Sequence, residues 1–398
     1  MEKIRATGTE RLLAIAMVFS VMTQLRVAEI IGVSEVIILY IGIFGKYPYE
    51  DNIIRYHKYQ DNFLKGIFLV MPLGLAWNFI TKDVFPQTVH DLFALIFAAF
   101  LCFMVLNRAK IYENLLGILY SFFFFETIAN VMYIAMYFTG RGFYDENFER
   151  FEGWSTDPNQ LAEALLLIPW LAIYFIRKVV QEKPQNRFFC IIISIACTVS
   201  SIGIGVITKS DSYVLASVIA IGVYLVVETV KIFVTQRGNR LVLLADIAGI
   251  AYLLLNTSAV MEFVNEYITK TAEDSNQLNV RERVWINGLK AFVHSPIFGN
   301  GPGSFSGQWG AFGGAESHNT YIYVMMDFGI VGLVLLLMLL YNAFKETLTA
   351  KASEMTAAFV SFLVFNFFHS FHRMPLFWFY LYLFIAVGIA ETRKYERV

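Results

Sequence analysis

Long apolar runs recur along the whole chain, and they constrain its fold more than any other feature. A helix of about 20 apolar residues spans the hydrocarbon core of a bilayer, which is roughly 30 Å thick. The chain has 398 residues, of which 57% are hydrophobic and 16% are charged, whereas soluble domains carry about 25% charged residues. We therefore predict an all-α polytopic membrane protein, with residues 1–398 forming a single integral membrane domain.

The sequence predicts twelve membrane-spanning helices, of which the first and the ninth are short. Their ranges are 12–25, 29–45, 64–80, 89–106, 115–138, 158–176, 189–207, 213–236, 241–255, 319–340, 355–370 and 375–390. Residues 256–318, between the ninth and tenth spans, form a loop of 63 residues, and the other connections are short. The first apolar run continues into the second without a small-residue cleavage site. We therefore expect an uncleaved first helix and no signal peptide.

The distribution of lysine and arginine predicts the topology. Twelve spans place both termini on one side, and 21 of the 31 lysines and arginines lie on that side. The other 10 are Arg26, Lys82, Arg141, Arg150, Lys209, Lys270, Arg281, Arg283, Lys290 and Arg373. Cytoplasmic loops are the ones enriched in basic residues, so we expect cytoplasmic termini and an extracytoplasmic 256–318 loop. The net charge of −1 offers no basic stripe for a nucleic acid.

Closely spaced glycines in "SPIFGNGPGSF", residues 295–305, first suggest a nucleotide-binding loop. Such a loop needs a preceding apolar strand and a helix that begins at its last glycine. Here Pro296 precedes the glycines and Pro302 interrupts them. The predicted topology also places the stretch outside the cell, where ATP and NAD are absent. We infer that these glycines let the backbone of the loop turn tightly.

The 256–318 loop also carries the pattern of an amphipathic helix. Trp285, Leu289, Phe292 and Val293 follow the spacing i, i+4, i+7 and i+8, and Arg281 lies one turn before Trp285. We expect this helix to lie along the membrane surface with Trp285 at headgroup depth. On spacing alone, two interpretations stay open: the arginines contact only lipid phosphates, or they contact a substrate.

His318 stands where the chain re-enters the membrane at the tenth span. An imidazole has an ordinary pKa of ~6.5 and can act as a general base, but a histidine at a helix start also bonds backbone groups. At the sixth span, Thr156 or Asp157 can cap the helix, and Pro158 suits its first position. Capping leaves Asn159 and Glu163 at the membrane edge without a structural reason.

The segments "RERVWINGLKAFVHSPIFGNGPGSF" and "SHNTYIYVMMDFGIVG" resemble the O-antigen ligase and O-antigen polymerase superfamily of bacterial envelope glycosyltransferases. Four elements carry the resemblance in order and spacing: Arg281 with Trp285, Pro296 to Gly301, Ser317 to Asn319, and Gly329 with Gly332. "DPNQLA", residues 157–162, is similar to the family's entry to an earlier span. The family has an arginine in a Thr-x-Ser-Arg turn, whereas residues 208–211 of this chain read Thr-Lys-Ser-Asp. Either Lys209 or Arg283 then supplies the second cation.

The resemblance implies transfer of a glycan from undecaprenyl pyrophosphate to an acceptor sugar, at the extracytoplasmic side of the bacterial inner membrane. It implies that His318 and Arg281 are catalytic, His318 as the base and Arg281 at the leaving pyrophosphate. Its substrate-binding residues would be Arg283, Lys209, Asn159, Asp157 and Asn319. The implied partners are the lipid-linked glycan, an acceptor glycan or lipid A-core, membrane lipids and a chain-length regulator protein. No nucleic acid or cofactor is implied.

Three functions fit these sequence features: a polymerase, a ligase and a flippase. A polymerase of lipid-linked repeat units is favoured over a ligase acting on lipid A-core, because the outer loops hold few basic residues for a second anionic lipid. A flippase for lipid-linked oligosaccharides is the alternative of another class, since Glu126, Asn130, Glu228 and Asp246 lie inside apolar runs. These four side chains equally suit contacts between helices. The long one-sided loop that ends in His318 favours an enzyme.

We expect no metal site in this chain. The outer loops hold no aspartate-rich motif, and Cys102, Cys190 and Cys197 all lie within apolar runs, so we expect neither a disulfide nor a metal cluster. "HSFHR", residues 369–373, pairs two histidines at i and i+3, which are too few ligands for a metal. We interpret it as an outer turn that borders the sugar channel.

Overall fold

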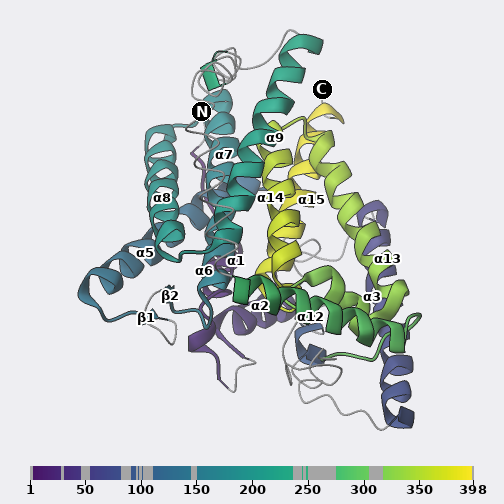
Figure 1. The fold of residues 1–398 in the computed structure, drawn as a ribbon. Coiled ribbons are helices and arrows are strands. Elements are labelled where there is room, and N and C mark those ends of the chain that lie inside the picture. The colour runs from purple at the N-terminus through teal and green to yellow at the C-terminus, as the bar shows by residue number, and fades with distance from the viewer. Residues whose placement is uncertain are drawn as a thin grey trace.

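The computed structural model is a bundle of helices (Figure 1). It describes residues 3–27, 31–45, 54–81, 91–95, 111–144, 150–235, 275–303 and 317–396, together with residues 97, 101, 244, 248 and 249. The longer helices are α1 (Gly8–Phe19), α2 (Val33–Phe44), α3 (Ile54–Thr81), α5 (Leu115–Thr139), α6 (Pro158–Leu166), α7 (Ile168–Glu182), α8 (Arg187–Ile207), α9 (Asp211–Thr235), α12 (Ser275–His294), α13 (Thr320–Thr349), α14 (Ser353–Phe368) and α15 (Pro375–Glu396). A short 3-10 helix, η1 (Thr23–Leu25), follows α1, and β1 (Phe143–Tyr144) pairs antiparallel with β2 (Phe151–Gly153).

Within the described residues, five helices are long and apolar enough to cross a membrane. They cover Leu115–Thr139, Arg187–Ile207, Asp211–Val234, Thr320–Thr349 and Pro375–Thr392. Three shorter apolar helices cover Val33–Phe44, Lys65–Trp77 and Ser353–Phe368. The predicted helical, membrane-spanning character is therefore confirmed. Most residues of the predicted spans 89–106 and 241–255 lie outside the described residues, so the number twelve stays a prediction.

Three details differ from the sequence-based prediction. α2 has 12 residues, or about 18 Å at 1.5 Å per residue, which is too short to span a bilayer. The predicted span 158–176 is two helices, because α6 ends at Leu166 and α7 begins at Ile168. Pro169 lies in the first turn of α7, where its missing N–H leaves no hydrogen bond unmade. The β1–β2 pair was not predicted at all.

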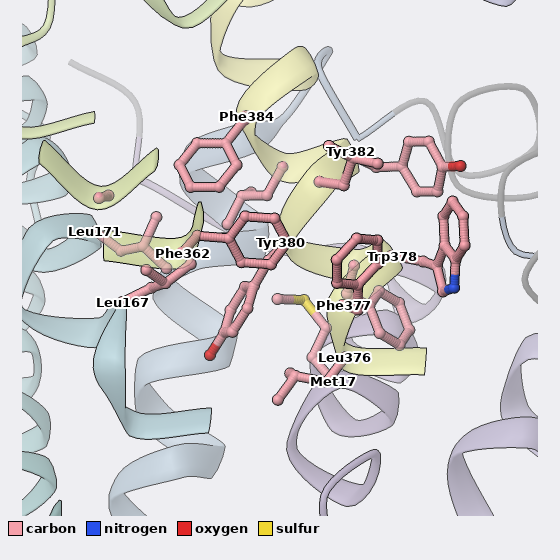
Figure 2. Close-up of a cluster of buried hydrophobic side chains, with 14 of the residues drawn as sticks. Met17, Leu167, Leu171, Phe362, Leu376, Phe377, Trp378, Tyr380, Tyr382 and Phe384 are labelled. Carbon is pink, nitrogen blue, oxygen red and sulfur yellow. The ribbon is translucent and has the colours of Figure 1, made fainter. Parts of the chain in front are cut away.

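α15 forms the centre of the bundle. In its apolar stretch 89% of the residues are buried, against 22% in α9. Figure 2 shows aromatic side chains of α15, among them Trp378 and Tyr380, packed with residues from α1, α7 and α14. The Tyr380 hydroxyl donates a hydrogen bond to the carbonyl oxygen of Ala164. A helix that is apolar all round belongs in the interior, whereas the exposed apolar side chains of α8 and α9 suit contact with lipid.

Polar contacts gather at two opposite ends of the bundle. Figure 1 shows both chain termini at one end, which we call the terminal end. There the Ile4 amide donates to Asn186 Oδ1 (3.0 Å), and Lys178 Nζ lies 2.6 Å from Glu391 Oε2. α12 runs across the opposite end of the long helices, which we call the site end. This arrangement is the one expected if both termini share a side of the membrane.

Polar side chains inside the predicted spans make contacts between helices. Asn130 Nδ2 on α5 donates to the hydroxyls of Ser200 (3.1 Å) and Ser201 (2.8 Å) on α8. Glu228 on α9 accepts hydrogen bonds from the Ser353 hydroxyl and from Lys231 Nζ. Asp246 lies outside the described residues. These contacts explain Asn130 and Glu228 without a transport path.

Candidate active site

The glycine stretch packs into a break in α13. Gly329 has φ 63° and ψ −162° inside this helix, which is not helical geometry. Four backbone hydrogen bonds join the two segments: Asn300 to Met326 (2.8 Å), Gly301 to Asp327 (2.9 Å), Ile330 to Pro296 (2.8 Å) and Val331 to Ile297 (3.4 Å), donor first. A phosphate-binding loop presents its N–H groups to the ligand. Here they bond to α13, so the inference that the glycines shape the loop is confirmed.

Two of these positions require glycine. Gly299 has φ 73° and Gly329 has φ 63°, and residues other than glycine rarely adopt such positive φ angles. A Cβ on Gly299 would overlap the backbone of Asp327, and a Cβ on Gly329 would overlap the carbonyl group of Ile297. The loop and α13 therefore touch backbone to backbone.

The predicted helix in the long loop is α12, and its buried face packs on α13. Val284, Asn287 and Ala291 lie on this face, and a Cβ on Gly288 would overlap Ile322 of α13. The spacing of these residues follows one face of a helix. The position of α12 across the site end is thus fixed by protein contacts.

The predicted apolar stripe of α12 divides between protein and exterior. The Trp285 ring lies 5.4 Å from the Phe367 ring at the end of α14, so the indole packs against the protein, and its position at headgroup depth stays a prediction. Leu289 and Val293 are exposed and remain available to lipid. α12 therefore presents one apolar edge to the bundle and another to its surroundings.

Arg281 lies on the same edge of α12 as Trp285. Its guanidinium carbon is 6.0 Å from the centre of the Phe368 ring, which is within the range of a cation–π contact. Burial lowers the pKa of Arg281; the charge of Asp211 opposes this effect and the charge of Arg150 adds to it. A guanidinium nevertheless keeps its proton in proteins. Arg281 is therefore a half-buried cation that lies near Arg150 and Asp211.

His318 precedes α13 in a conformation that is uncommon for its residue type. Its φ is 48°, and such strain at a residue other than glycine clusters at functional sites. The side chain is exposed. Asn319 caps the helix beside it, with Oδ1 accepting from the amides of Tyr321 (2.9 Å) and Ile322 (3.0 Å). Asn319 thus acts as a cap that fixes where His318 stands.

His369 joins the start of α13 to the start of α9. The Thr320 amide and hydroxyl both donate to the His369 carbonyl oxygen, at 2.9 and 2.8 Å. The His369 ring is buried, and its Nε2 lies 3.0 Å from the Ser212 hydroxyl. Burial first, and then the charges of Arg281, His318 and Arg150, lower the pKa of His369 well below its ordinary value. The buried imidazole of His369 is therefore neutral.

Asn159 belongs to the same cluster, and Asp157 positions it. Asp157 Oδ1 accepts from the Asn159 amide at 2.7 Å, so Asp157 caps α6. Asn159 Oδ1 accepts from Arg150 Nη2 (3.0 Å) and from the Ser210 hydroxyl (2.8 Å). Arg150 Nε also donates to the Thr208 carbonyl oxygen at 3.1 Å. Arg150 thereby ties the β1–β2 pair to α6 and to the turn between α8 and α9.

Lys209 and Arg283 lie outside this cluster. Both side chains are exposed, and Lys209 occupies the left-handed turn before α9, with φ 49°. Arg283 is two residues from Arg281, which places it about 200° around the helix. The structure therefore brings together Arg281, His318 and Asn159, and it adds Arg150 and His369, to which the sequence analysis gave no catalytic or binding role. The sequence signal for His369 was the turn "HSFHR" after an apolar run; Arg150 had none.

Within the described part of the chain, no group of three or more His, Cys, Asp or Glu residues is placed to hold a metal ion. His369 and His372 face different neighbours, Ser212 and Tyr323. Cys190 and Cys197 are buried free thiols, and Cys102 lies outside the described residues.

Comparison with known families bears on the same segment. Residues 195–337 match the family model described as O-antigen ligase. No curated protein is matched by the chain. The matched range contains Arg281, the glycine stretch, His318 and the break at Gly329. This match supports the resemblance of residues 195–337 to the O-antigen ligase family.

Proposed function

We propose that the protein is a membrane glycosyltransferase that moves a glycan from undecaprenyl pyrophosphate to an acceptor sugar, as the polymerase of a surface polysaccharide. The observation that carries the proposal is that Arg281 and His318, both within the matched range, lie beside the turn that contains His369: Arg281 contacts the Phe368 ring, and the residues after His318 bond to this turn. One is a permanent cation, and the other is an exposed imidazole. A glycosyl transfer with a pyrophosphate leaving group needs this pair of groups.

The reaction assigns a separate task to each side chain. The acceptor hydroxyl oxygen forms a bond to the anomeric carbon, and the bond from that carbon to the pyrophosphate oxygen breaks. The electron pair leaves with the pyrophosphate, whose growing charge Arg281 stabilises through paired N–H donors. The hydroxyl proton passes to the imidazole of His318. No further reactant is required.

His318 is a better base than His369 because of where each ring lies. The His318 side chain is exposed, so an acceptor sugar can reach it. The His369 ring is buried against Ser212. Its neutral form adds no positive charge between Arg281 and His318. We assign His369 to positioning and His318 to proton transfer.

The remaining predicted residues fit around this centre. Asp157 and Asn319 cap α6 and α13. They would contact the substrate only through side-chain atoms that do not take part in capping. Asn159 presents its amide group beside Arg150. Lys209 and Arg283, both exposed, suit contacts with the glycan at the edge of the site. In the proposed topology this site faces the extracytoplasmic side of the bacterial inner membrane, where the lipid-linked donor, the acceptor and a chain-length regulator protein meet it.

The test uses purified protein in lipid with undecaprenyl-pyrophosphate-linked repeat units. Arg281→Ala and His318→Ala should each lower transfer by a factor of ~100 to ~10,000, the range for a missing acid–base or charge-stabilising group. His318→Ala should still bind the donor, and Arg281→Lys should recover little activity, because an ammonium lacks the paired donors. Lys290→Ala is the matched control, since Lys290 is an exposed cation of the same helix. Full activity in Arg281→Ala would refute the proposed role of this arginine.

The same assay separates the polymerase from the ligase. With repeat units as the only substrate, a ladder of longer lipid-linked chains supports polymerisation. Transfer that begins only when lipid A-core is added, with no ladder before it, identifies a ligase. The scarcity of basic residues on the proposed outer side favours the ladder, because lipid A-core is a second anionic lipid.

A further inference from the structure

We propose that Arg150 is the second cation of the donor site, where it and Arg281 each bind one phosphate group of a polyprenyl diphosphate. This inference rests on the proposed function and extends it to a residue outside the matched range 195–337. It identifies the cation that stands where Lys209 and Arg283 were expected.

The first argument is the way in which Arg150 is held. Its Nε and Nη2 donate to Thr208 O (3.1 Å) and Asn159 Oδ1 (3.0 Å), and Asn159 is itself fixed by Ser210. These contacts come from the α8–α9 turn and from α6, so two independent elements set the plane of the guanidinium. A guanidinium fixed in this way has lost its side-chain freedom before the ligand arrives.

The second argument is the set of charged groups near Arg150. Its charge lowers the pKa of both Arg281 and His369. Hydrogen bonds and ring contacts connect the surroundings of the two arginines. Arg150 and Ser210 both donate hydrogen bonds to Asn159. Two residues further along, the Ser212 hydroxyl bonds to His369. His369 directly follows Phe368, whose ring contacts Arg281. Two arginines in one partly buried cluster repel each other. An anion bound between them is attracted to both and offsets this repulsion, so the cluster favours anion binding.

The third argument comes from charge and from chain geometry. Asp211 begins α9 and offsets part of the charge of Arg281. A diphosphate carries more charge than a monophosphate, so a site with one cation facing an aspartate favours it less. A second guanidinium restores the excess of positive charge. Lys209 and Arg283 are exposed, whereas Arg150 is held by hydrogen bonds beside Asn159 and Thr208.

A purely structural role for Arg150, as a tie between β2, α6 and the α8–α9 turn, predicts a different outcome. Loss of a structural tie would lower stability and weaken all ligands alike. Loss of a phosphate contact would weaken the diphosphate more than the monophosphate, because only the diphosphate needs two cations. The ratio of the two affinities therefore separates the roles.

The experiment measures binding of farnesyl diphosphate and farnesyl monophosphate to the full-length protein in detergent. The wild type should prefer the diphosphate. Arg150→Gln should bind the diphosphate about tenfold more weakly or worse, which is the typical effect of one charge-assisted hydrogen bond, and should lose most of the preference. Arg150→Lys should lie between the two. Arg141→Gln, which removes an exposed arginine just after α5, should match the wild type.

The outcomes are distinct. If the wild type binds and both Arg150 variants keep its diphosphate preference, Arg150 is only a structural tie and the proposal is wrong. If the wild type binds neither farnesyl ligand, the failure lies with the lipid-diphosphate donor and hence with the proposed function. If Arg150→Gln does not accumulate, Arg150→Lys still reports the ratio, and an unchanged ratio there overturns the proposal.

Discussion

At the scale of single residues, the two histidines of the turn after α14 meet different surroundings. His369 bonds Ser212. The ring of His372 lies 4.9 Å from the ring of Tyr323, and its carbonyl accepts from Trp378 Nε1 at 2.7 Å. Burial lowers the pKa of His372 to about 3; Arg373 adds to this shift and Asp91 opposes it. Both imidazoles are therefore neutral in the folded protein at neutral pH.

These lowered pKa values predict how stability depends on pH. Below a pH of about 6.5 the unfolded chain protonates both histidines, whereas the folded chain does not. The stability contributed by the neutral rings is therefore complete above pH 6.5 and is lost as the pH falls below it. Each histidine contributes a slope of about 1.4 kcal/mol per pH unit. The thermal unfolding midpoint of the purified protein should accordingly fall between pH 7 and pH 5.

The variant that checks this prediction is His369→Gln, whose side-chain amide can still meet Ser212. Its unfolding midpoint should fall less steeply with pH than that of the wild type. His372 continues to titrate in both proteins and serves as the internal reference. A pH profile identical to the wild type would mean that the pKa of His369 is the same in the folded and the unfolded chain.

At the scale of elements, the break in α13 allows the glycine stretch to pack directly against the backbone of this helix. The broken helix leaves amides and carbonyls that its own turns no longer satisfy, and the stretch 295–303 bonds to them. Since α12 leads directly into this stretch, the helix that carries Arg281 and the helix start that follows His318 are joined by backbone contacts. Their separation is set by the backbone and not by side chains.

Gly299→Ala should therefore be strongly destabilising. The new side chain would have to adopt φ 73°, which costs about 1 to 2 kcal/mol, and its Cβ would overlap the Asp327 backbone, at a further cost of about 1 to 3 kcal/mol. The matched control is Gly203→Ala, because nothing lies within 4 Å of a Cβ at this helical position. We expect a clearly lower unfolding midpoint for Gly299→Ala and an equal or higher one for Gly203→Ala. Equal midpoints would contradict the close backbone contact.

At the scale of the whole molecule, both termini lie at the end of the bundle opposite α12 (Figure 1). Basic side chains pair with buried acids near the terminal end, as in Arg177 with Glu354 (2.8 Å). The site end instead gathers Arg150, Arg281 and His318. A cytoplasmic terminal end would agree with the enrichment of lysine and arginine there.

Labelling of single cysteines in intact cells tests this topology. Lys183→Cys, in the exposed turn between α7 and α8, should resist a membrane-impermeant maleimide until the cells are opened. Glu282→Cys, on the exposed side of α12, should react at once. Cys190 and Cys197 are buried, and Cys102, which lies outside the described residues, is replaced by serine in both variants. If both positions react alike, the predicted arrangement of the spans is wrong.

Much of this architecture could be predicted because hydrophobic length and period are local properties of a sequence. α5, α8, α13 and α15 follow directly from apolar runs, and the spacing around Trp285 predicted α12. The split at Leu167 had a local signal in Pro169, which was overlooked. The position of Arg150 had none, because its partners Asn159 and Thr208 are 9 and 58 residues away. Side-chain contacts of this kind follow from tertiary packing and not from local pattern.

The interlocked break in α13 also sets limits for anyone who builds chimeras between this protein and a relative. A graft of the 295–303 stretch alone would form the backbone bonds of Asn300 and Gly301 only if the foreign α13 broke at the same position. The smallest cassette that can be exchanged therefore runs from Ser275 to at least Val331, with its own helix break included. Exchange of that cassette should transfer donor preference only in part, because Arg150 lies outside it and would not be exchanged.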